Sequence, residues 1–242
     1  MKTNQSKQTK KADYGQEMSG IIIITSILAI VLLTIAFWQF YQYGNQKLCI
    51  SILLTFTGFI FFFFAIVGVW SSRSGKFILR NKVFGKLEFK GNETVLDLGC
   101  GKGLLLIEAA KKLTQGKAFG VDHWVGNLEY KYSAQMVLDN AKIEGVSDRI
   151  ELVTADAQDL PFGDGSFDVV MTSLMMHHVP DTKKALNEMV RVLKPGGTLV
   201  IADINSKRYA PIIQSFGLKR IEIQYATRLF LVPAYIIKGV KS

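Results

Sequence analysis

The sequence predicts a mostly parallel, doubly wound α/β domain that is preceded by two transmembrane helices. Three observations lead to this fold class. Two long uncharged apolar windows come first, short apolar runs then alternate with helical stretches, and two β-rich runs with no helix between them end the chain. Nearly continuous apolar strands separated by helices are typical of a parallel sheet that is covered on both faces. We expect a basic tail, a two-helix hairpin, a basic linker and an α/β domain at residues 1–18, 19–72, 73–90 and 91–242, respectively.

The first two elements are apolar windows that are long enough to cross a bilayer. No charged residue occurs from Met18 to Gln46 or from Leu48 to Ser72. About 20 apolar residues in a helix span the hydrocarbon core, and only a few residues near 42–47 connect the windows, which predicts a helical hairpin. A cleaved signal sequence would have a shorter apolar core, and a buried soluble hairpin would need more chain to cover it than this sequence offers.

The orientation follows from the lysines and arginines beside the windows. The connecting loop carries only Lys47, whereas both outer flanks are basic. Flanking positive charge stays on the cytoplasmic side, so we expect a multi-pass membrane protein with both termini and the α/β domain in the cytoplasm. Contact with anionic lipid headgroups then explains the net charge of +9, which requires no nucleic-acid partner. The outer basic residues are Lys2, Lys7, Lys10, Lys11, Arg73, Lys76, Arg80, Lys82 and Lys86.

The α/β part follows from the alternation of short β-rich runs with helical stretches. The final two runs have no helix between them, so we expect a terminal antiparallel pair at residues 218–230 and 232–241. The "LKPGG" stretch predicts a turn before the fifth strand, because proline stops a helix and glycine permits a reversal. The other expected strands are residues 94–99, 117–122, 150–156, 167–173 and 198–203, and the expected helices are residues 104–113, 128–144, 183–193 and a short one after Ser206.

Acids and glycines follow the expected strands at the point where each strand ends. Ligands of open parallel sheets bind beyond these carboxyl ends, and three acids there would repel a nucleotide diphosphate. The glycine spacing departs from a dinucleotide-binding loop at Leu104, and Lys102 lacks the hydroxyl partner of a P-loop. A cofactor with a cationic amino-acid part, a ribose and an adenine fits these side chains better. The residues at the strand ends are Asp97, Gly99, Gly101, Gly103, Asp122, Asp156, Thr172 and Ser173.

Four stretches in the expected order and spacing carry a family resemblance. "VLDLGCGKG", "GVD", "TADAQDLPFGDGSFDVV" and "ALNEMVRVLKPGGTLVIAD" resemble the class I S-adenosylmethionine-dependent methyltransferases, especially the small-molecule group called type 11. The resemblance covers residues 92–204. It implies a seven-stranded sheet with a reversed last strand, S-adenosyl-L-methionine as the cofactor and S-adenosyl-L-homocysteine as the product.

The resemblance also implies roles for individual residues. Asp97 would meet the methionine amino group, Asp122 the ribose hydroxyls, and Asp156 the adenine amine. His123 or Trp124 would pack near the adenine. A single acid at a strand end is otherwise often a helix cap or a turn former. The expected cofactor-binding residues are Asp97, Gly99, Cys100, Gly101, Gly103, Asp122, His123, Asp156, Ala157, Thr172 and Ser173, and no metal ligand is expected.

A histidine pair follows the fourth strand in the stretch "LMMHHVPD". The sulfonium methyl is displaced in line, so a methyltransferase mainly aligns the reacting atoms, but a hydroxyl or activated-carbon acceptor also needs a base. Histidine suits that work near neutral pH, which makes His177 and His178 the candidate catalytic residues. The alternative is that one or both begin a helix or pack under the loop.

The acceptor is predicted only as a class. The membrane hairpin favours an acceptor that enters the bilayer or lies at its surface, such as a quinone-like ring, an isoprenoid or a modified lipid headgroup. Two alternatives stay open: a membrane-tethered protein or RNA methyltransferase, and a noncatalytic scaffold that binds the cofactor. A motif like "NPPY", which is typical of amine-methylating enzymes, is not found after strand four.

Overall fold

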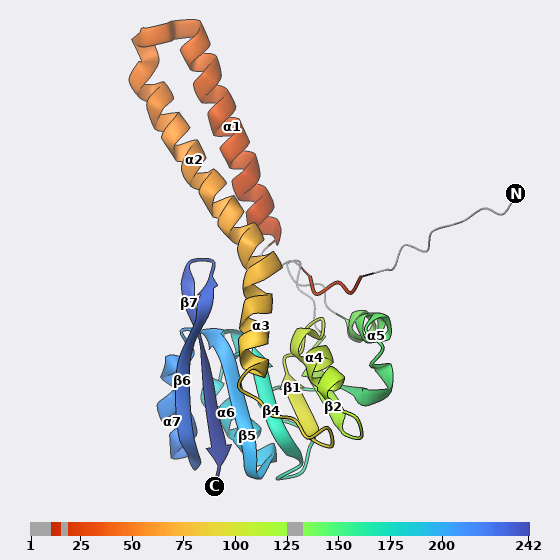
Figure 1. The fold of residues 1–242 in the computed structure, drawn as a ribbon. Coiled ribbons are helices and arrows are strands. Elements are labelled where there is room, and N and C mark those ends of the chain that lie inside the picture. Colours follow the sequence, from red (N-terminus) through yellow and green to blue (C-terminus); the bar gives the residue numbers. More distant parts are fainter. Residues whose placement is uncertain (1–10, 16–18, 125–132) are drawn as a thin grey trace, which may run out of the picture.

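A computed structural model describes residues 11–15, 19–124 and 133–242 of the chain. A long apolar helical hairpin projects from one end of a domain built around a seven-stranded sheet (Figure 1). The strands are β1 (Thr94–Leu98), β2 (Lys117–Asp122), β3 (Ile150–Thr154), β4 (Phe167–Ser173), β5 (Leu193–Ile204), β6 (Leu218–Leu229) and β7 (Val232–Lys241). The α-helices are α1 (Ser19–Tyr43), α2 (Leu48–Trp70), α3 (Lys76–Phe84), α4 (Leu104–Lys112), α5 (Ala134–Ile143), α6 (Thr182–Val192) and α7 (Ala210–Ser215).

The strand order is β3-β2-β1-β4-β5-β7-β6. Strands β1 to β5 are parallel, whereas β7 runs antiparallel to both β5 and β6. The sheet is therefore mixed, and the predicted seven-stranded α/β fold with a reversed last strand is confirmed. The strand order reverses between β1 and β4, which is where ligands bind in sheets of this kind.

Helices cover both faces of the sheet because the side chains of each strand alternate between them. Leu79 of α3, Leu106 of α4 and Val137 of α5 belong to one buried apolar cluster. Leu186 of α6 and Ile213 of α7 belong to the other. Apolar burial on both faces explains why the strands are almost continuously apolar in sequence.

The hairpin packs through small residues at intervals of seven along each helix. Ala29 and Ala36 are buried in α1, and Ser51, Gly58 and Ala65 are buried in α2. A Cβ atom at Gly58 would lie 2.9 Å from Cγ of Leu33 in α1. Small residues let the two backbones approach closely, and the large apolar side chains point outward instead.

One continuous helical segment, Ser19–Phe84, is long and apolar enough to cross a membrane among the residues the structure describes. It holds both predicted windows, because the 3₁₀ turn η1 (Gly44–Lys47) joins α1 to α2. The structure therefore offers one candidate segment, folded back as a hairpin, in place of two separate ones. Insertion into a membrane remains a prediction.

The predicted basic linker is mostly helical. A π-helical turn, η2 (Ser71–Gly75), joins α2 directly to α3. Leu79 and Val83 of α3 are fully buried in the sheet's apolar core. The segment after the hairpin therefore packs as part of the α/β layers, and a stiff connection joins the two regions.

A short stretch of the N-terminal tail also lies on the domain. The backbone N–H of Asp13 donates to Oδ1 of Asn140 in α5 at 2.9 Å. Lys76 of α3 donates from Nζ to the carbonyl of Tyr14 at 2.8 Å. Residues 11–15 thus bridge α3 and α5, which the composition of the tail did not predict.

One element prediction needs correction, and another lies partly outside the described residues. The "LKPGG" stretch does not precede the fifth strand, because β5 begins at Leu193, which pairs with Phe167. Pairing resumes at Thr198 after a register shift, so residues 194–197 form an irregularity inside β5. The predicted helix at 128–144 is observed as α5, and residues 125–132 lie outside the described part of the chain.

Candidate active site

The glycine loop after β1 has the backbone geometry that its composition predicts. Gly99, Gly101 and Gly103 have φ angles of 71°, 53° and 83°, a left-handed region that favours glycine. A Cβ atom at Gly99 would collide with the side chain of Met175. At Gly101 nothing described lies within 4 Å of a Cβ position, so that side of the loop is open to a ligand.

Asp97 is buried beneath this loop at the end of β1. Its Oδ2 atom accepts a hydrogen bond at 2.9 Å from the backbone N–H of Leu106, the third residue of α4. Burial raises the pKa of this carboxyl to about 7, and the nearby charge of Asp122 adds to the increase. A cationic ligand group beside Asp97 would favour the ionised form.

Asp122 and Asp156 lie at the ends of β2 and β3. Oδ2 of Asp122 accepts from the N–H of Gly101 at 2.8 Å, which ties the glycine loop to β2. Oδ1 of Asp156 accepts from the N–H of Gln158 at 2.8 Å, and this bond lowers the pKa of Asp156. His123 lies beside it, with Nε2 3.5 Å from Oδ1 of Asp156. Both acids are partly exposed, so they keep lone pairs for hydroxyl or amine donors.

Besides Asp97, three predicted site residues have buried side chains. The Cys100 thiol is buried and its pKa is raised by that burial, so it is not poised as a nucleophile. Oγ1 of Thr172 donates to the carbonyl of Leu98 at 2.8 Å and thereby ties β4 to β1. Ala157 is also buried, whereas Ser173 at the end of β4 is partly exposed. Any ligand contact of Cys100 or Ala157 would be through the backbone.

His177 makes a side-chain contact with Asp203 that the sequence interpretation missed. Its Nδ1 atom lies 2.6 Å from Oδ1 of Asp203, and its backbone N–H donates to Oδ2 at 3.2 Å. Asp203 is fully buried at the end of β5 and also accepts from the N–H of Ile204 at 2.7 Å. Because Nδ1 is paired with Asp203, Nε2 is the ring nitrogen that could exchange a proton with a ligand. His178 is exposed, and its ring centroid lies 4.0 Å from that of His177.

Sequence reasoning missed two residues of the site, Asp203 and Met175, and only the first could have been predicted. Asp203 ends a predicted strand, so the rule that selected Asp97, Asp122 and Asp156 could have found it. The strand-end rule does not select Met175. Its side chain lies against Gly99, and the residue before it, Leu174, has a φ of 53° that the sequence does not predict.

Trp124 carries an unusual buried donor near the predicted adenine position. Its Nε1 atom is buried without a hydrogen-bond partner in the described part of the chain. Its backbone N–H donates to Oδ1 of Asp122 at 3.3 Å, so the main chain at Trp124 is held next to the acid predicted to bind the ribose. An orphaned buried donor is costly, and an acceptor on a bound ligand would relieve that cost.

The arrangement fits a cofactor with a sulfonium amino acid, a ribose and an adenine. Asp97 could meet an ammonium group, Asp122 a ribose diol and Asp156 an amine, while Gly101 leaves room for the ligand against the backbone. Among the described residues, no cluster of three His, Cys, Asp or Glu side chains could hold a metal ion.

The family model described as a methyltransferase domain matches residues 89–223. The chain is 37% identical over 139 residues to demethylmenaquinone methyltransferase of Lactobacillus johnsonii, which covers 56% of this chain and 53% of that relative. It is 35% identical over 122 residues to sterol 4-C-methyltransferase of Caenorhabditis elegans, which covers 49% of this chain and 33% of that relative. The chain thus spans about a third to a half of the length of these relatives.

Solved structures share the fold. A SAM-dependent methyltransferase from Aquifex aeolicus is similar with a TM-score of 0.58 and 19% identity, covering 74% of this chain and 98% of that one. Geranyl diphosphate C-methyltransferase from Streptomyces coelicolor is similar with a TM-score of 0.58 and 15% identity, covering 73% and 82% of the two chains. At these identities the likeness shows the fold alone.

Proposed function

Since this chain belongs to the family of S-adenosylmethionine-dependent methyltransferase domains, we propose that the whole protein methylates a small amphiphilic acceptor at the cytoplasmic face of a membrane. The observation that carries the proposal is the direction of the sheet. The carboxyl ends of β1 to β5, where the site residues lie, point toward the end from which the apolar hairpin projects (Figure 1).

The build of the hairpin supports membrane insertion. Apart from Ile22, its buried residues are small, and many of its large apolar side chains are exposed, including Phe37, Phe56 and Phe59. Soluble monomers rarely expose so large a continuous apolar surface. Helices that face lipid do expose such surfaces, because lipid tails are as apolar as the side chains. The 25 residues of α1 extend roughly 37 Å, enough to cross a bilayer core.

Strand register supports placing the site near that membrane. Asp203 of β5 pairs with Tyr235 of β7, and Ile204 pairs with Ala234. Strand β7 begins at Val232, so Asp203 is only a few residues from the β6–β7 turn. That turn contacts the base of the hairpin, where α1 begins and α2 ends. An acceptor dissolved in the bilayer would therefore reach the site without crossing bulk water.

The chemistry divides between binding and proton transfer. S-adenosyl-L-methionine, when bound, supplies an electrophilic methyl group. The acids Asp97, Asp122 and Asp156 would bind its polar groups, and the glycine loop would lie against it. His177 would accept the proton of an acceptor hydroxyl or acidic carbon at Nε2. Asp203 acts as a positioning residue, because it holds the ring through Nδ1 and favours the imidazolium that forms.

The acceptor class is supported by the relatives as well as by location. Proteins named for demethylmenaquinone and for a sterol are among those similar to this chain. Both names denote compounds with a compact ring and an extended apolar part. We propose the same general class here, with the ring at the site and the apolar part in the bilayer.

The test uses the full chain in lipid nanodiscs with S-adenosyl-L-methionine labelled on the methyl group. The probes are reduced demethylmenaquinone, a sterol and a total membrane-lipid extract, compared with RNA and with protein. We expect label in a lipid-soluble product. Label in RNA or protein would replace this proposal with a macromolecular acceptor, and cofactor binding without any turnover would favour the scaffold.

Matched histidine variants test the proposed base. His177→Ala should lower turnover by about 100-fold or more, which is the usual loss for a general base, without weakening cofactor binding. His178→Ala is the control and should have a smaller effect, since the contacts of Asp203 are made by its neighbour. Equal losses in both variants, or loss of cofactor binding in His177→Ala, would contradict the role.

A further inference from the structure

The turn between β6 and β7 is made of bulky apolar residues in an unfavourable backbone conformation. Leu229 pairs with Val232, so Phe230 and Leu231 form a two-residue turn. Both have positive φ angles, 48° and 67°. Turns of this kind favour Asn-Gly, because most side chains disfavour positive φ. Such strain persists only where the surroundings fix it, and it concentrates at functional positions.

Contacts with the hairpin base fix the turn. The N–H of Phe230 donates to Oγ of Ser71 at 3.2 Å. A Cβ atom at Gly68 would lie 3.7 Å from the Phe230 ring, and one at Gly75 would lie 2.6 Å from the side chain of Leu229. The turn is therefore level with the last residues of α2 and packs against the π-helical turn that follows them.

Phe230 and Leu231 differ in what covers them. Phe230 packs into the hairpin base, but Leu231 is 44% exposed. Trp70, at the end of α2, is exposed to the same fraction. An apolar turn beside the end of an apolar helix lies at the depth where headgroups meet acyl chains if the hairpin is inserted.

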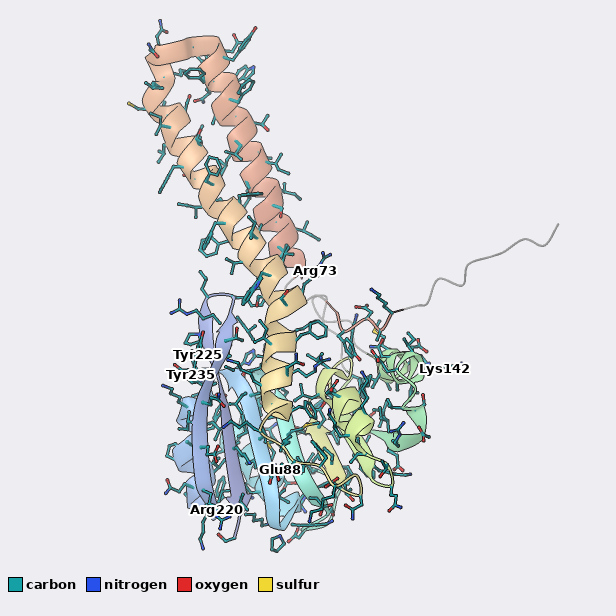
Figure 2. The ribbon with its side chains drawn as sticks, viewed as in Figure 1. Arg73, Glu88, Lys142, Arg220, Tyr225 and Tyr235 are labelled. Carbon is teal, nitrogen blue, oxygen red and sulfur yellow. The ribbon has the colours of Figure 1, made fainter. Side chains whose placement is uncertain are left out.

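Two arginines lie close in sequence to the exposed apolar residues Trp70 and Leu231. Arg73 lies three residues after Trp70, and Arg228 directly precedes Leu229; both are exposed. Arg73 lies at the junction of hairpin and domain, whereas Arg220 lies at the far end of the domain (Figure 2). Basic side chains next to apolar ones match an anionic phospholipid surface, because the charges meet headgroup phosphates while the apolar groups enter below them.

We infer that the β6–β7 turn is a second membrane contact, which inserts Leu231 into the headgroup boundary of an anionic bilayer with Arg73 and Arg228 at the phosphates. The inference rests on the proposed insertion of the hairpin. Its consequence concerns the site: β7 starts at the turn and pairs with the end of β5, which carries Asp203. Contact at the turn therefore holds the site edge against the membrane.

The experiment measures the depth of single probes in the full chain. In a Cys49→Ser background, an environment-sensitive fluorophore is placed at Leu231→Cys and read in nanodiscs that contain phosphatidylglycerol and nitroxide-labelled lipids. Cys100 is buried and is left in place. Lys219→Cys is the matched control, because it is exposed on the same strand pair at the opposite end of β6, roughly 40 Å away for 12 residues. Phe56→Cys reports on the hairpin itself.

We expect lipid quenching at position 231 to exceed that at position 219 several-fold, with an emission shift to shorter wavelength. Quenching at position 56 with none at position 231 would overturn the inference and leave the membrane anchor standing. Quenching at neither position would overturn the inference together with the proposed anchoring.

A second variant separates membrane contact from folding. Leu231→Asn suits a positive φ better than leucine does, so the thermal stability of the chain in detergent should hold or rise. Methyl transfer to a bilayer acceptor should nevertheless fall several-fold, with cofactor affinity unchanged. Undiminished transfer by this variant in anionic nanodiscs would contradict a functional role for the contact.

Discussion

The hairpin and the sheet domain bury opposite kinds of side chain. In the hairpin, Ala36, Ser51 and Gly58 lie inside, and large apolar residues face outward. In the domain, large residues such as Leu96 and Leu106 are fully buried on the faces of the sheet. The contrast supports the proposal that the hairpin is built for lipid and the domain for water. Packing of small residues stabilises helices in lipid, whereas burial of large apolar residues stabilises a domain in water.

The junction of the two regions is stiff. Helix α2 passes through η2 into α3 without a loop, and α3 packs on the sheet. The turn after β6 and residues 11–15 add contacts at the same level. The unbroken helical path from α2 through η2 to α3 thus fixes the orientation of the site edge relative to the hairpin. A flexible tether would not constrain it.

The largest predicted effect comes from removing a large buried side chain from the core of the domain. Leu96→Ala removes a fully buried side chain and should lower the free energy of unfolding by about 2–5 kcal/mol. Phe59→Ala is the control, because Phe59 is 59% exposed in the hairpin and should leave domain unfolding unchanged. Urea unfolding of the chain in detergent micelles measures both. Comparable destabilisation by Phe59→Ala would show that the hairpin buries large residues after all.

The hairpin should instead be destabilised by a larger side chain between its two helices. Gly58→Val places new atoms against Leu33 and should cost about 1–3 kcal/mol by overpacking. Gly20→Ala in α1 is the control: a Cβ there meets nothing described within 4 Å, and alanine favours a helix over glycine. Unfolding by SDS in mixed micelles, followed by circular dichroism, compares the two. A tolerated valine would contradict close packing of the helices.

The buried acid of the domain predicts a pH effect that the hairpin, whose only charged residue is Lys47, lacks. The raised pKa of Asp97, about 7, means that the free site binds a proton below that pH. A cofactor ammonium favours the carboxylate, so binding should release a proton, and affinity should fall as pH drops below about 7, by at most tenfold per unit. Calorimetry in buffers of different ionisation enthalpy measures the release, which Asp97→Asn should abolish.

The same pKa has a consequence for stability without the cofactor. The folded pKa lies above the unfolded value of 3.8, so the folded chain holds the proton over the window between them. The contribution of Asp97 to stability is full below about pH 4 and is lost as pH rises toward 7. A rise of stability with pH in the wild-type chain that vanishes in Asp97→Asn would contradict the sign.

The smallest effect is expected at the surface of the junction. Lys102 lies 2.9 Å from Asp13, whose side chain is 78% exposed, and the hydrogen bond from Lys102 lowers the pKa of Asp13. Exposed pairs contribute less than about 1 kcal/mol. Asp13→Asn should therefore change the unfolding free energy at neutral pH by less than that amount. A larger loss would mean that residues 11–15 are tied to the domain more by charge than by backbone contacts.

Local sequence patterns predicted most of the domain because its elements follow local rules. The alternation of apolar runs and helices gave the strands, and the glycines of "VLDLGCGKG" have the positive φ that their spacing requires. Acids at strand ends marked Asp97, Asp122 and Asp156. The same rule applies to Asp203, whose role emerged only when β4 and β5 brought it to His177.

The features that sequence reasoning missed depend on contacts between distant segments. Thr172 bonds to Leu98 across the sheet, which its position at a strand end did not reveal. The basic residues after the hairpin suggested a linker, but burial of Leu79 and Val83 makes that segment part of the core. The strained turn at Phe230 and Leu231 follows from contacts with the hairpin base, which is distant in sequence.

The most direct test of the account asks whether the acceptor must share a bilayer with the enzyme. The full chain is reconstituted in nanodiscs that contain whichever lipid-soluble probe it methylates, and methyl transfer is compared with that of the same chain in acceptor-free nanodiscs mixed with separate acceptor-loaded vesicles. Because the site edge faces the hairpin, transfer should occur in the shared bilayer and be at least tenfold slower to the separate one. Equal rates would contradict a site that draws its acceptor from the membrane in which the hairpin lies.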